Sequence, residues 1–547
     1  MKKLWQKPGF RDGLKLFGVY LLLHGLMLVL TGTFHDDWVN WFKDPVTKDL
    51  EGIQSGRPYY AWVIELVWLL PGYGYRILAF LTYFAAYDFL YLTLSRVPEI
   101  RRQEAFLIAA ITMAVPVNDA RVLLANYPYA LGMLLFWIGA WMLVGNIGRL
   151  NRIGIRLGVL AVFFLSFTLN SNLVMYGGVL LYLMIRFRPR EWVRYLDFVA
   201  LPIVFYALGK ALFPVYGLEY EEYNLISLGG LVWAVASIPA TVRNILLDMA
   251  NMVLADNTAF MAALAGAAAW GGILFLTRKR RAAETDFVRE RSSEAAAKSS
   301  SGQNDRRELM FTEEEAPKGN RDLVIFLFGL VLLIAGFFPY TAVRQRTYLA
   351  LTGVNGRDSM LLGVGTAMML FSLPIRSLRR PLAVFAVILG ICHFGNWYMN
   401  YQAEWYRQLA FQHDVAGIED IAVGGNYVVK VSEDSAVEDR RFYTWSGNAA
   451  AATGKRTAFL FNGDGNAEML QNPANIDYVV THYPMFTDYR YHPEVDGTLY
   501  FNVRVSREDT IQLKMQELFD RSGFEQRIGE IGDVDYVKAL AEKDGET

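Results

Sequence analysis

Long apolar runs alternate with short polar stretches over most of this sequence. The runs are roughly 17–22 residues long, the length that crosses a hydrocarbon core of ~30 Å. We therefore predict a polytopic α-helical membrane protein with about eleven transmembrane helices. The expected spans lie near 14–31, 73–95, 104–117, 127–145, 157–170, 173–187, 196–213, 257–276, 322–341, 358–374 and 381–400.

Basic residues fall on alternate connections between these spans. The N-terminal segment carries Lys2, Lys3, Lys7, Arg11 and Lys15, and positive charge beside a first span keeps the N-terminus in the cytoplasm. The further cytoplasmic connections read SRVPEIRR, GNIGRLNRIGIR, IRFRPREWVR, TRKRR and IRSLRR. The stretch FHDDW after the first span should then lie on the outer side. Because the number of expected spans is odd, everything after Tyr401 should lie there too.

Two further segments have the pattern of interfacial helices. In 59–70 the apolar residues line one helical side, and PGYGY then turns the chain into the next span. The second half of 225–254 is amphipathic in the same way, and we expect it to lie on the outer membrane face. Segment 225–254 could instead add a span, which would put TRKRR outside and reverse the three spans that follow.

A change of composition divides the chain into four parts. We assign 1–277 to an N-terminal transmembrane module and 322–400 to the last three spans. Residues 278–321 are polar and read as a disordered or loosely helical cytoplasmic linker. Residues 401–547 read as a small extracytoplasmic α/β domain. Its expected strands are NYVVKVS, TAFLF, IDYVVTHY and GTLYFNVRVS, and its expected helices are EWYRQLAFQHDVAGIEDI and TIQLKMQELFDRSG.

The overall composition fits this picture and narrows the chemistry. The chain has 547 residues, of which 53% are hydrophobic, and this fraction is high for a soluble enzyme. Its one cysteine, Cys392, rules out an intramolecular disulfide. The net charge of −1 says nothing about partners, because the charges are sorted by loop and do not act as one field. As partners we expect membrane lipids and no nucleic acid.

The first outer loop holds the acidic pair Asp36 and Asp37. One of them could simply accept hydrogen bonds at the start of the short helix WVNWF, a role that suits Asp37 better. Alternatively, a carboxylate at the membrane surface could act as a general base, or the pair could hold a divalent cation such as Mg²⁺ or Mn²⁺. His35 could carry a proton, bind a metal or contact the substrate phosphate, or it could only form hydrogen bonds. No zinc-type spacing is present.

Two other outer loops carry candidate phosphate-binding residues. Asp119 and Arg121 lie between the third and fourth spans, where they could also just cap a turn. Arg344, Arg346 and Arg357 follow the ninth span, on the side where positive charge is disfavoured. Guanidinium groups match phosphate oxygens with paired N–H donors, whether on a bound substrate or on lipid headgroups.

The stretch from residue 12 to 95 resembles the GT-C superfamily of membrane glycosyltransferases. The resemblance rests on Asp36 and Asp37 in the first outer loop and on a G-R-P entry, Gly56, Arg57 and Pro58, before an interfacial helix and a span that opens with an Arg, Arg76.

This resemblance implies a reaction at the outer face of the membrane. A polyprenyl-phosphate sugar would be the donor, and one Asp would deprotonate a hydroxyl of a glycan or lipid acceptor. That hydroxyl would attack the anomeric carbon with inversion, and the leaving phosphate would need cationic stabilisation. Arg57 and the outer arginines are our candidates for this role, the latter placed by topology and not by a motif match. No cofactor is certain, and a metal would bind Asp36 and Asp37 only in a metal-dependent member.

Other classes of function remain open. A transporter or flippase of a lipid-linked saccharide would predict internal repeats and polar residues at mid-membrane. A non-catalytic envelope scaffold would leave the acids and arginines without a shared purpose. A phosphoethanolamine-type transferase would need a larger outer domain with a metal cluster. We favour a transferase of cell-envelope glycan synthesis in a bacterial inner membrane, with the C-terminal domain periplasmic or extracellular.

Overall fold

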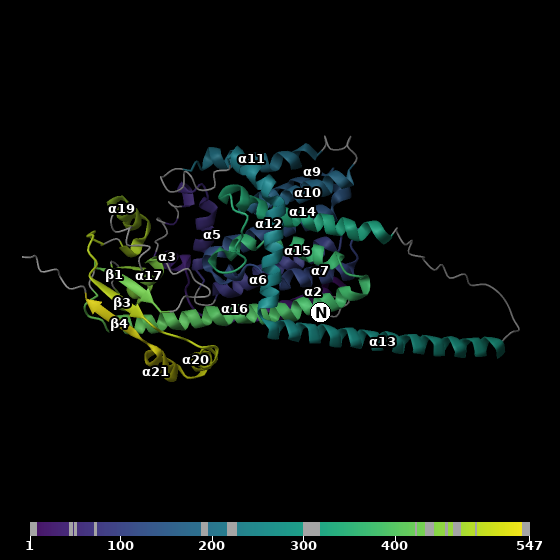
Figure 1. Cartoon of the computed structure of the whole chain (residues 1–547). Helices are drawn as coiled ribbons and strands as arrows, with labels where there is room; N and C mark the ends of the chain where they lie inside the picture. Colours follow the sequence, from purple (N-terminus) through teal and green to yellow (C-terminus); the bar gives the residue numbers. More distant parts are fainter. Residues whose placement is uncertain are drawn as a thin grey trace, which may run out of the picture.

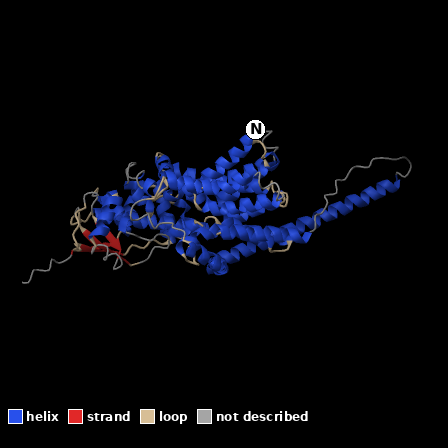
Figure 2. Ribbon diagram, turned by 90° about the horizontal axis from the view of Figure 1, so that it is seen from above, coloured by secondary structure: helices blue, strands red, loops and turns tan. Residues whose placement is uncertain are grey.

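The computed structural model describes residues 8–42, 48, 52–70, 74–187, 195–215, 227–298, 318–421, 424–432, 442–454, 458–462, 472–486 and 489–538. Helices make up most of the molecule, and a small sheet lies at one end (Figure 2). The expected linker 278–321 is described only in part: helix α13 continues through it to Lys298, and 299–317 lie outside the described residues.

Most of the helices form one bundle (Figure 1). Helices occupy every stretch that hydropathy predicts as a span. They are α2 (Pro8–His24, extended by the 3₁₀ turn η1, Gly25–Leu28), α6 (Gly74–Leu94), α7 (Arg102–Ala114), α8 (Tyr127–Gly145), α9 (Ile153–Ser166), α10 (Ser171–Arg186), α11 (Leu196–Leu212), α13 (Asn257–Lys298), α14 (Lys318–Arg344), α15 (Leu362–Ser372) and α16 (Arg379–Ala416).

Several of these helices have the length and the apolar composition of membrane-spanning helices. Among the described residues, six helices are long and apolar enough to cross one. They lie at Gly74–Leu94, Leu124–Gly145, Leu228–Ala255, Asn257–Thr277, Arg321–Val343 and Arg376–Ala416. Helix α13 leaves Met261, Ile273 and Phe275 at least half exposed to the surroundings. Apolar surface of this extent suits a membrane-embedded protein.

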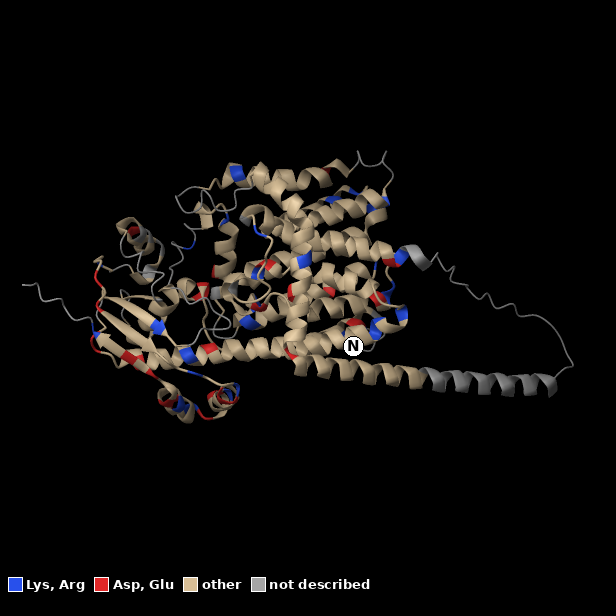
Figure 3. Cartoon of the chain, in the orientation of Figure 1, with Lys and Arg blue, Asp and Glu red and all other residues tan. Residues whose placement is uncertain are grey.

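The end of the bundle away from the sheet carries a group of charged side chains (Figure 3). At that end Arg379 pairs with Glu104 and Asp322, which joins α16, α7 and α14. Arg186 also pairs with Glu99, so parts of three of the basic connections, SRVPEIRR, IRFRPREWVR and IRSLRR, lie close together in the described residues.

From residue 228 on, segment 225–254 forms a single continuous helix, α12 (Leu228–Ala255). α12 runs across the direction of the bundle helices (Figure 1). Its Asn244 donates to Thr347, just after α14, and its Met249 contacts Thr366 in α15. Farther along, Met252 lies beside Pro116, which follows α7. Helix α12 therefore packs along the end of the bundle that carries the loops after α7 and α14.

The C-terminal domain is built on a four-stranded sheet with strand order β2-β1-β3-β4. β1 pairs in parallel with β2 and β3, and β4 is antiparallel to β3. The strands are β1 (Asn426–Val431), β2 (Phe459–Asn462), β3 (Gly497–Phe501) and β4 (Val534–Lys538), and the helices are α17 (Phe442–Thr453), α19 (Pro473–His482), α20 (Arg507–Phe519) and α21 (Arg521–Ile531). Three of the four expected strands form, together with the expected α20.

The predicted strand IDYVVTHY is wrong, because this stretch is part of helix α19. Pro473 occupies the first turn, where a missing N–H costs nothing, and Asn472 accepts the amide of Ala474 at 3.1 Å. Ile476 and Val479, three residues apart, share the buried face. These capping signals outweigh the β-branched pattern that favours a strand.

Helix α16 joins the bundle to the C-terminal domain without a break. The sequence predicts a span over 381–400 and a separate helix over 404–421, and the structure runs both together as one helix of 38 residues. Tyr406, Phe411 and Val415 in its second half pack in the core of the sheet domain. A continuous helix is a stiff connection, so the domain has a fixed place relative to the bundle.

Candidate active site

The candidate site begins at a turn between the first bundle helix and the short helix α3 (Asp36–Phe42). Gly32 has φ +116°, and a Cβ there would lie 2.7 Å from the ring of Trp405, so only glycine fits. His35 has φ +44°, an unusual conformation for a residue with a side chain. This turn brings the imidazole of His35 back over the first residue of α3.

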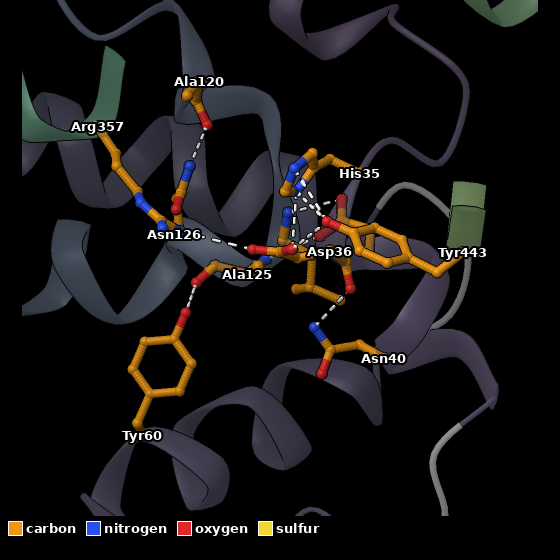
Figure 4. A network of polar contacts seen from close by, with 11 residues as sticks. His35, Asp36, Asn40, Tyr60, Ala120, Ala125, Asn126, Arg357 and Tyr443 are labelled. Carbon is orange, nitrogen blue, oxygen red and sulfur yellow. Dashed lines mark hydrogen bonds and ion pairs between the residues drawn. The ribbon is translucent and has the colours of Figure 1, made fainter. Parts of the chain in front are cut away.

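Asp36 has charged or polar partners at both carboxylate oxygens (Figure 4). Its Oδ1 lies 2.7 Å from Nδ1 of His35 and accepts a hydrogen bond of 3.1 Å from the hydroxyl of Tyr443. Its Oδ2 lies 3.5 Å from Nη1 of Arg357. The side chain is 36% exposed. Asp36 is therefore oriented by its neighbours and still accessible to a reactant.

The surroundings of Asp36 keep it ionised. Burial alone would raise its pKa, but the hydrogen bond and charge of His35 outweigh burial, with help from Arg357 and Tyr443. The net result is a pKa well below the usual range of an aspartate. Asp36 is then a carboxylate at every physiological pH.

Asp37 has a different role from its neighbour. Its two oxygens accept backbone N–H bonds from Leu124 at 3.0 Å and Ala125 at 2.9 Å. The hydrogen bonds it receives in the described residues thus come from the turn η3 (Leu124–Asn126), and not from the amides of its own helix as the capping interpretation expects. Only 3% of Asp37 is exposed. It fastens α3 to the connection between α7 and α8.

The pKa of Asp37 predicts a specific dependence of stability on pH. Burial raises this pKa from 3.8 to about 6, despite the opposing hydrogen bonds from Ala125 and Leu124. Between these two values the folded protein holds a proton that the unfolded chain releases. Stability should therefore fall as pH rises through this window and level off above it.

In Asp37→Asn this fall should become shallower, as measured by the apparent unfolding temperature of the detergent-solubilised protein. Burial also raises the pKa of Asp119, to about 7, with the same sign. The part of the fall between pH 6 and 7 should thus persist in the variant and serves as an internal control. An unchanged slope between pH 4 and 6 would contradict the assignment to Asp37.

Asp119 holds the loop that carries Arg357. It lies in η2 (Asp119–Val122) and is buried, and its Oδ2 accepts the amide of Gly353 at 2.8 Å. Gly353 directly precedes the turn η6 (Val354–Ser359), which contains Arg357. A Cβ at Gly356 would lie 2.6 Å from Oδ1 of Asp119, so the two turns are in close contact. Asp119 thus positions Arg357 indirectly, by holding the backbone of the turn that carries it.

Arg121 is enclosed in the bundle and does not line the cavity described below. Its side chain is 1% exposed. Its Nε and Nη2 donate to the carbonyls of Asn118 and Val117, both at 2.8 Å, and its Nη1 lies 3.0 Å from Nε2 of His24. This arginine stabilises the connection between α7 and α8, and the structure does not bring it to Asp36.

A cavity of about 560 Å³ adjoins the Asp36–Arg357 pair. Arg357 belongs both to its wall and to the contact with Asp36. Other polar groups of the wall come from Arg57, Tyr60, Tyr129, Asn170, Ser171 and Asp358, and its apolar part includes Leu169, Leu173, Val174, Phe205, Leu231 and Phe338. Ligand pockets commonly have this size and this mixture of apolar wall and a few polar groups.

The remaining candidate arginines differ in their distance from this cavity. Arg57 precedes helix α5 (Pro58–Trp68), whose first residue is the proline of the G-R-P entry, and it lines the cavity. Arg346 is exposed and is not among the lining residues. Arg344 ends α14, and its side chain lies outside the described part of the chain.

The acidic pair does not form a shared metal-binding pocket. Within the described residues, no three His, Cys, Asp or Glu side chains gather in a way that would hold an ion. The oxygens of Asp37 face backbone amides, and those of Asp36 face His35, Tyr443 and Arg357. This donor set favours charge pairing over chelation of a metal ion.

Sequence reasoning missed two contributors to the site. Tyr443 lies 407 positions after Asp36, and nothing in the residues around it signals a link to the acidic pair. The hydroxyl of Tyr60 donates to the carbonyl of Ala125, next to the bonds of Asp37 (Figure 4). Arg76, singled out by the resemblance, is buried and donates to the carbonyl of Gly32 at 2.5 Å. It supports the turn before α3.

Comparison with known proteins adds no relative: no family model, no curated protein and no solved structure matches the chain.

Proposed function

We propose that this chain is an integral membrane glycosyltransferase of the GT-C type. It would move a sugar from a polyprenyl-phosphate donor to a glycan or lipid acceptor at the outer face of the membrane. The observation that carries the proposal is the position of Arg357. It lies between an accessible, ionised carboxylate and a cavity with an apolar wall and a second arginine. A lipid-linked phosphate sugar has a group to match each feature: an isoprenoid for the apolar wall, a phosphate for the arginines, and an anomeric carbon for attack by the hydroxyl that the carboxylate would deprotonate.

The proposed placement in the membrane follows from the two ends of the bundle. The basic end would face the cytoplasm together with the N-terminus, as the positive-inside bias requires. The opposite end, with Asp36 and the sheet domain, would face the periplasm of a bacterial inner membrane. Helices α5 and α12 would lie along the outer interface. Among the residues they expose, Trp62, Leu66 and Val232 are more than half exposed and would contact lipid.

In the proposed reaction the arginines bind the donor phosphate and Asp36 activates the acceptor. The donor phosphate binds Arg357 and Arg57, with its isoprenoid against the apolar wall. Asp36 takes the proton of the acceptor hydroxyl, and the oxygen attacks the anomeric carbon with inversion. The bond from that carbon to the phosphate oxygen breaks, and the leaving polyprenyl phosphate keeps the electron pair. The arginines stabilise this anion.

Donor binding would also tune the base. In the free protein Arg357 helps to depress the pKa of Asp36. A bound phosphate would share the charge of Arg357 and thereby let the pKa of Asp36 rise toward a value suited to proton transfer. The base would therefore become most effective once the donor is in place.

Reconstitution of the full-length protein in liposomes tests the proposal. The liposomes would contain a radiolabelled, extracted pool of polyprenyl-phosphate sugars and an extracted envelope glycan or lipid fraction. We expect label to move to the acceptor fraction together with release of polyprenyl phosphate. Passage of intact lipid-linked sugar across the bilayer with no cleavage would instead favour a flippase. If neither transfer nor passage of the lipid-linked sugar is observed, a non-catalytic scaffold would be the better interpretation.

A further inference from the structure

The carboxyl ends of β1 and β3 in the sheet of the C-terminal domain face α3. Arg407, near the middle of the outer half of α16, lies over the ring of Phe501 at the carboxyl end of β3. Farther from the bundle, the carbonyl of Asp420 accepts the hydroxyl of Tyr427 at the amino end of β1. Because α16 leads out of the bundle, the carboxyl ends of β1 and β3 are the nearer ones.

This edge is where sheets of this topology bind ligands. The chain passes from β1 to β2 on one side and then to β3 on the other side of β1. Open α/β sheets bind their ligands outside the carboxyl ends of the strands, at the point where the strand order reverses. In this protein that point lies between β1 and β3, on the edge directed at α3.

Close packing fixes the domain against α3. The indole N–H of Trp38 donates to Oε1 of Gln408 at 3.0 Å. A Cβ at Gly447 in α17 would lie 3.1 Å from the ring of Trp38, so the two helices are in direct contact. This contact sets where the first turn of α17, which follows β1, lies relative to Asp36.

That first turn supplies Tyr443. The side chain is buried, and its ring stacks on Tyr483 with an interplanar angle of 13°. Its hydroxyl donates to Oδ1 of Asp36 at 3.1 Å and lies 3.0 Å from Nε2 of His35 (Figure 4). Both His35 and Tyr443 thus meet Asp36 at Oδ1, while Oδ2 is directed toward Arg357.

We propose that the C-terminal domain is part of the reaction site, with Tyr443 as a positioning residue for Asp36. The inference rests on the proposed function, in which Asp36 is the base. By holding Oδ1, Tyr443 fixes the plane of the carboxylate. The remaining oxygen then keeps one direction, toward the arginine and the cavity.

Tyr443→Phe tests this role because it keeps the ring and removes only the hydroxyl. A hydrogen bond to a charged group is lost, so we expect kcat for transfer to fall about 10- to 100-fold. Donor binding should be unchanged, because Tyr443 is not among the residues that line the cavity. Tyr500→Phe, a partly exposed tyrosine on β3, is the matched control and should transfer at the native rate.

The pH profile separates positioning from a merely structural effect. The groups that act on Asp36 are His35 in the turn, Arg357 in η6 and Tyr443 in α17, and the charge of Asp36 acts in turn on Asp37 and Tyr60. Of these, the Tyr443 hydroxyl helps to lower the pKa of Asp36. Its removal should move the acid limb of kcat to higher pH. The limb should stay in place in Tyr500→Phe.

The possible results distinguish the inference from the function on which it rests. No transfer by the native protein would overturn the proposed function itself. Native transfer with an unchanged rate and acid limb in Tyr443→Phe would overturn only the positioning role. Loss of donor binding together with transfer in that variant would overturn it as well, because Tyr443 would then support the fold of the bundle.

Discussion

Replacement of Asp36 by asparagine should abolish most of the transfer activity and leave donor binding intact. Asparagine keeps the size of the side chain and its contacts with His35 and Tyr443, but it cannot take a proton from the acceptor. General base catalysis contributes about 10²–10⁴-fold to a rate, and a loss of that size is expected. Transfer from a labelled polyprenyl-phosphate sugar pool in liposomes is the measurement.

Donor affinity provides the sharper part of this prediction. Asp36 opposes the negative charge of a phosphate bound at Arg357, 3.5 Å away, so its neutral replacement should bind donor at least as tightly as the native protein. Asp248→Asn, an acidic residue on α12 that accepts the Tyr348 hydroxyl, is the matched control and should keep native transfer. Native transfer in a folded Asp36→Asn protein would exclude Asp36 as the base.

Replacement of Arg357 by alanine should have the second large effect, on donor binding. The side chain of Arg357 is 18% exposed and lies in the cavity wall. Truncation of one partner of an enclosed charge pair costs about 2–5 kcal/mol, and each 1.4 kcal/mol is a factor of ten. Donor affinity, measured by direct binding of labelled donor to the purified protein, should therefore fall on the order of 30-fold or more.

Arg346→Ala is a demanding control for this experiment. Both arginines lie in the same connection between α14 and α15, and the sequence gives them equal weight. Arg346 is exposed and is absent from the cavity wall, so its loss should change donor affinity by less than about twofold, as expected for a screened surface charge. Equal losses in the two variants would mean that the cavity is not the phosphate site.

The order of elements and their general character could be predicted from the sequence. Apolar runs of spanning length, separated by basic connections, place a helix at each expected position because local hydropathy is set by neighbouring residues alone. The acidic pair and the G-R-P entry also stand out locally. Helix α19 shows the limit of such patterns, since a capping Asn and a Pro in the first turn decide between helix and strand.

The roles within the site depended on contacts between distant segments. Adjacent aspartates look equivalent in the sequence, yet Asp37 meets the amides of Leu124 and Ala125, and Asp36 meets Arg357 and Tyr443. Burial and neighbouring charge therefore move their pKa values in opposite directions.

What the sequence determined by itself is a helical chain suited to a membrane, a small α/β domain and an acidic pair at the end of its first helix, because each follows from residues close together in the chain. Only the tertiary structure decided which aspartate is accessible, which arginine it faces and that the C-terminal domain reaches it. Those properties arise where the ends of α3, η6 and α17 converge, and such convergence leaves no trace in local sequence.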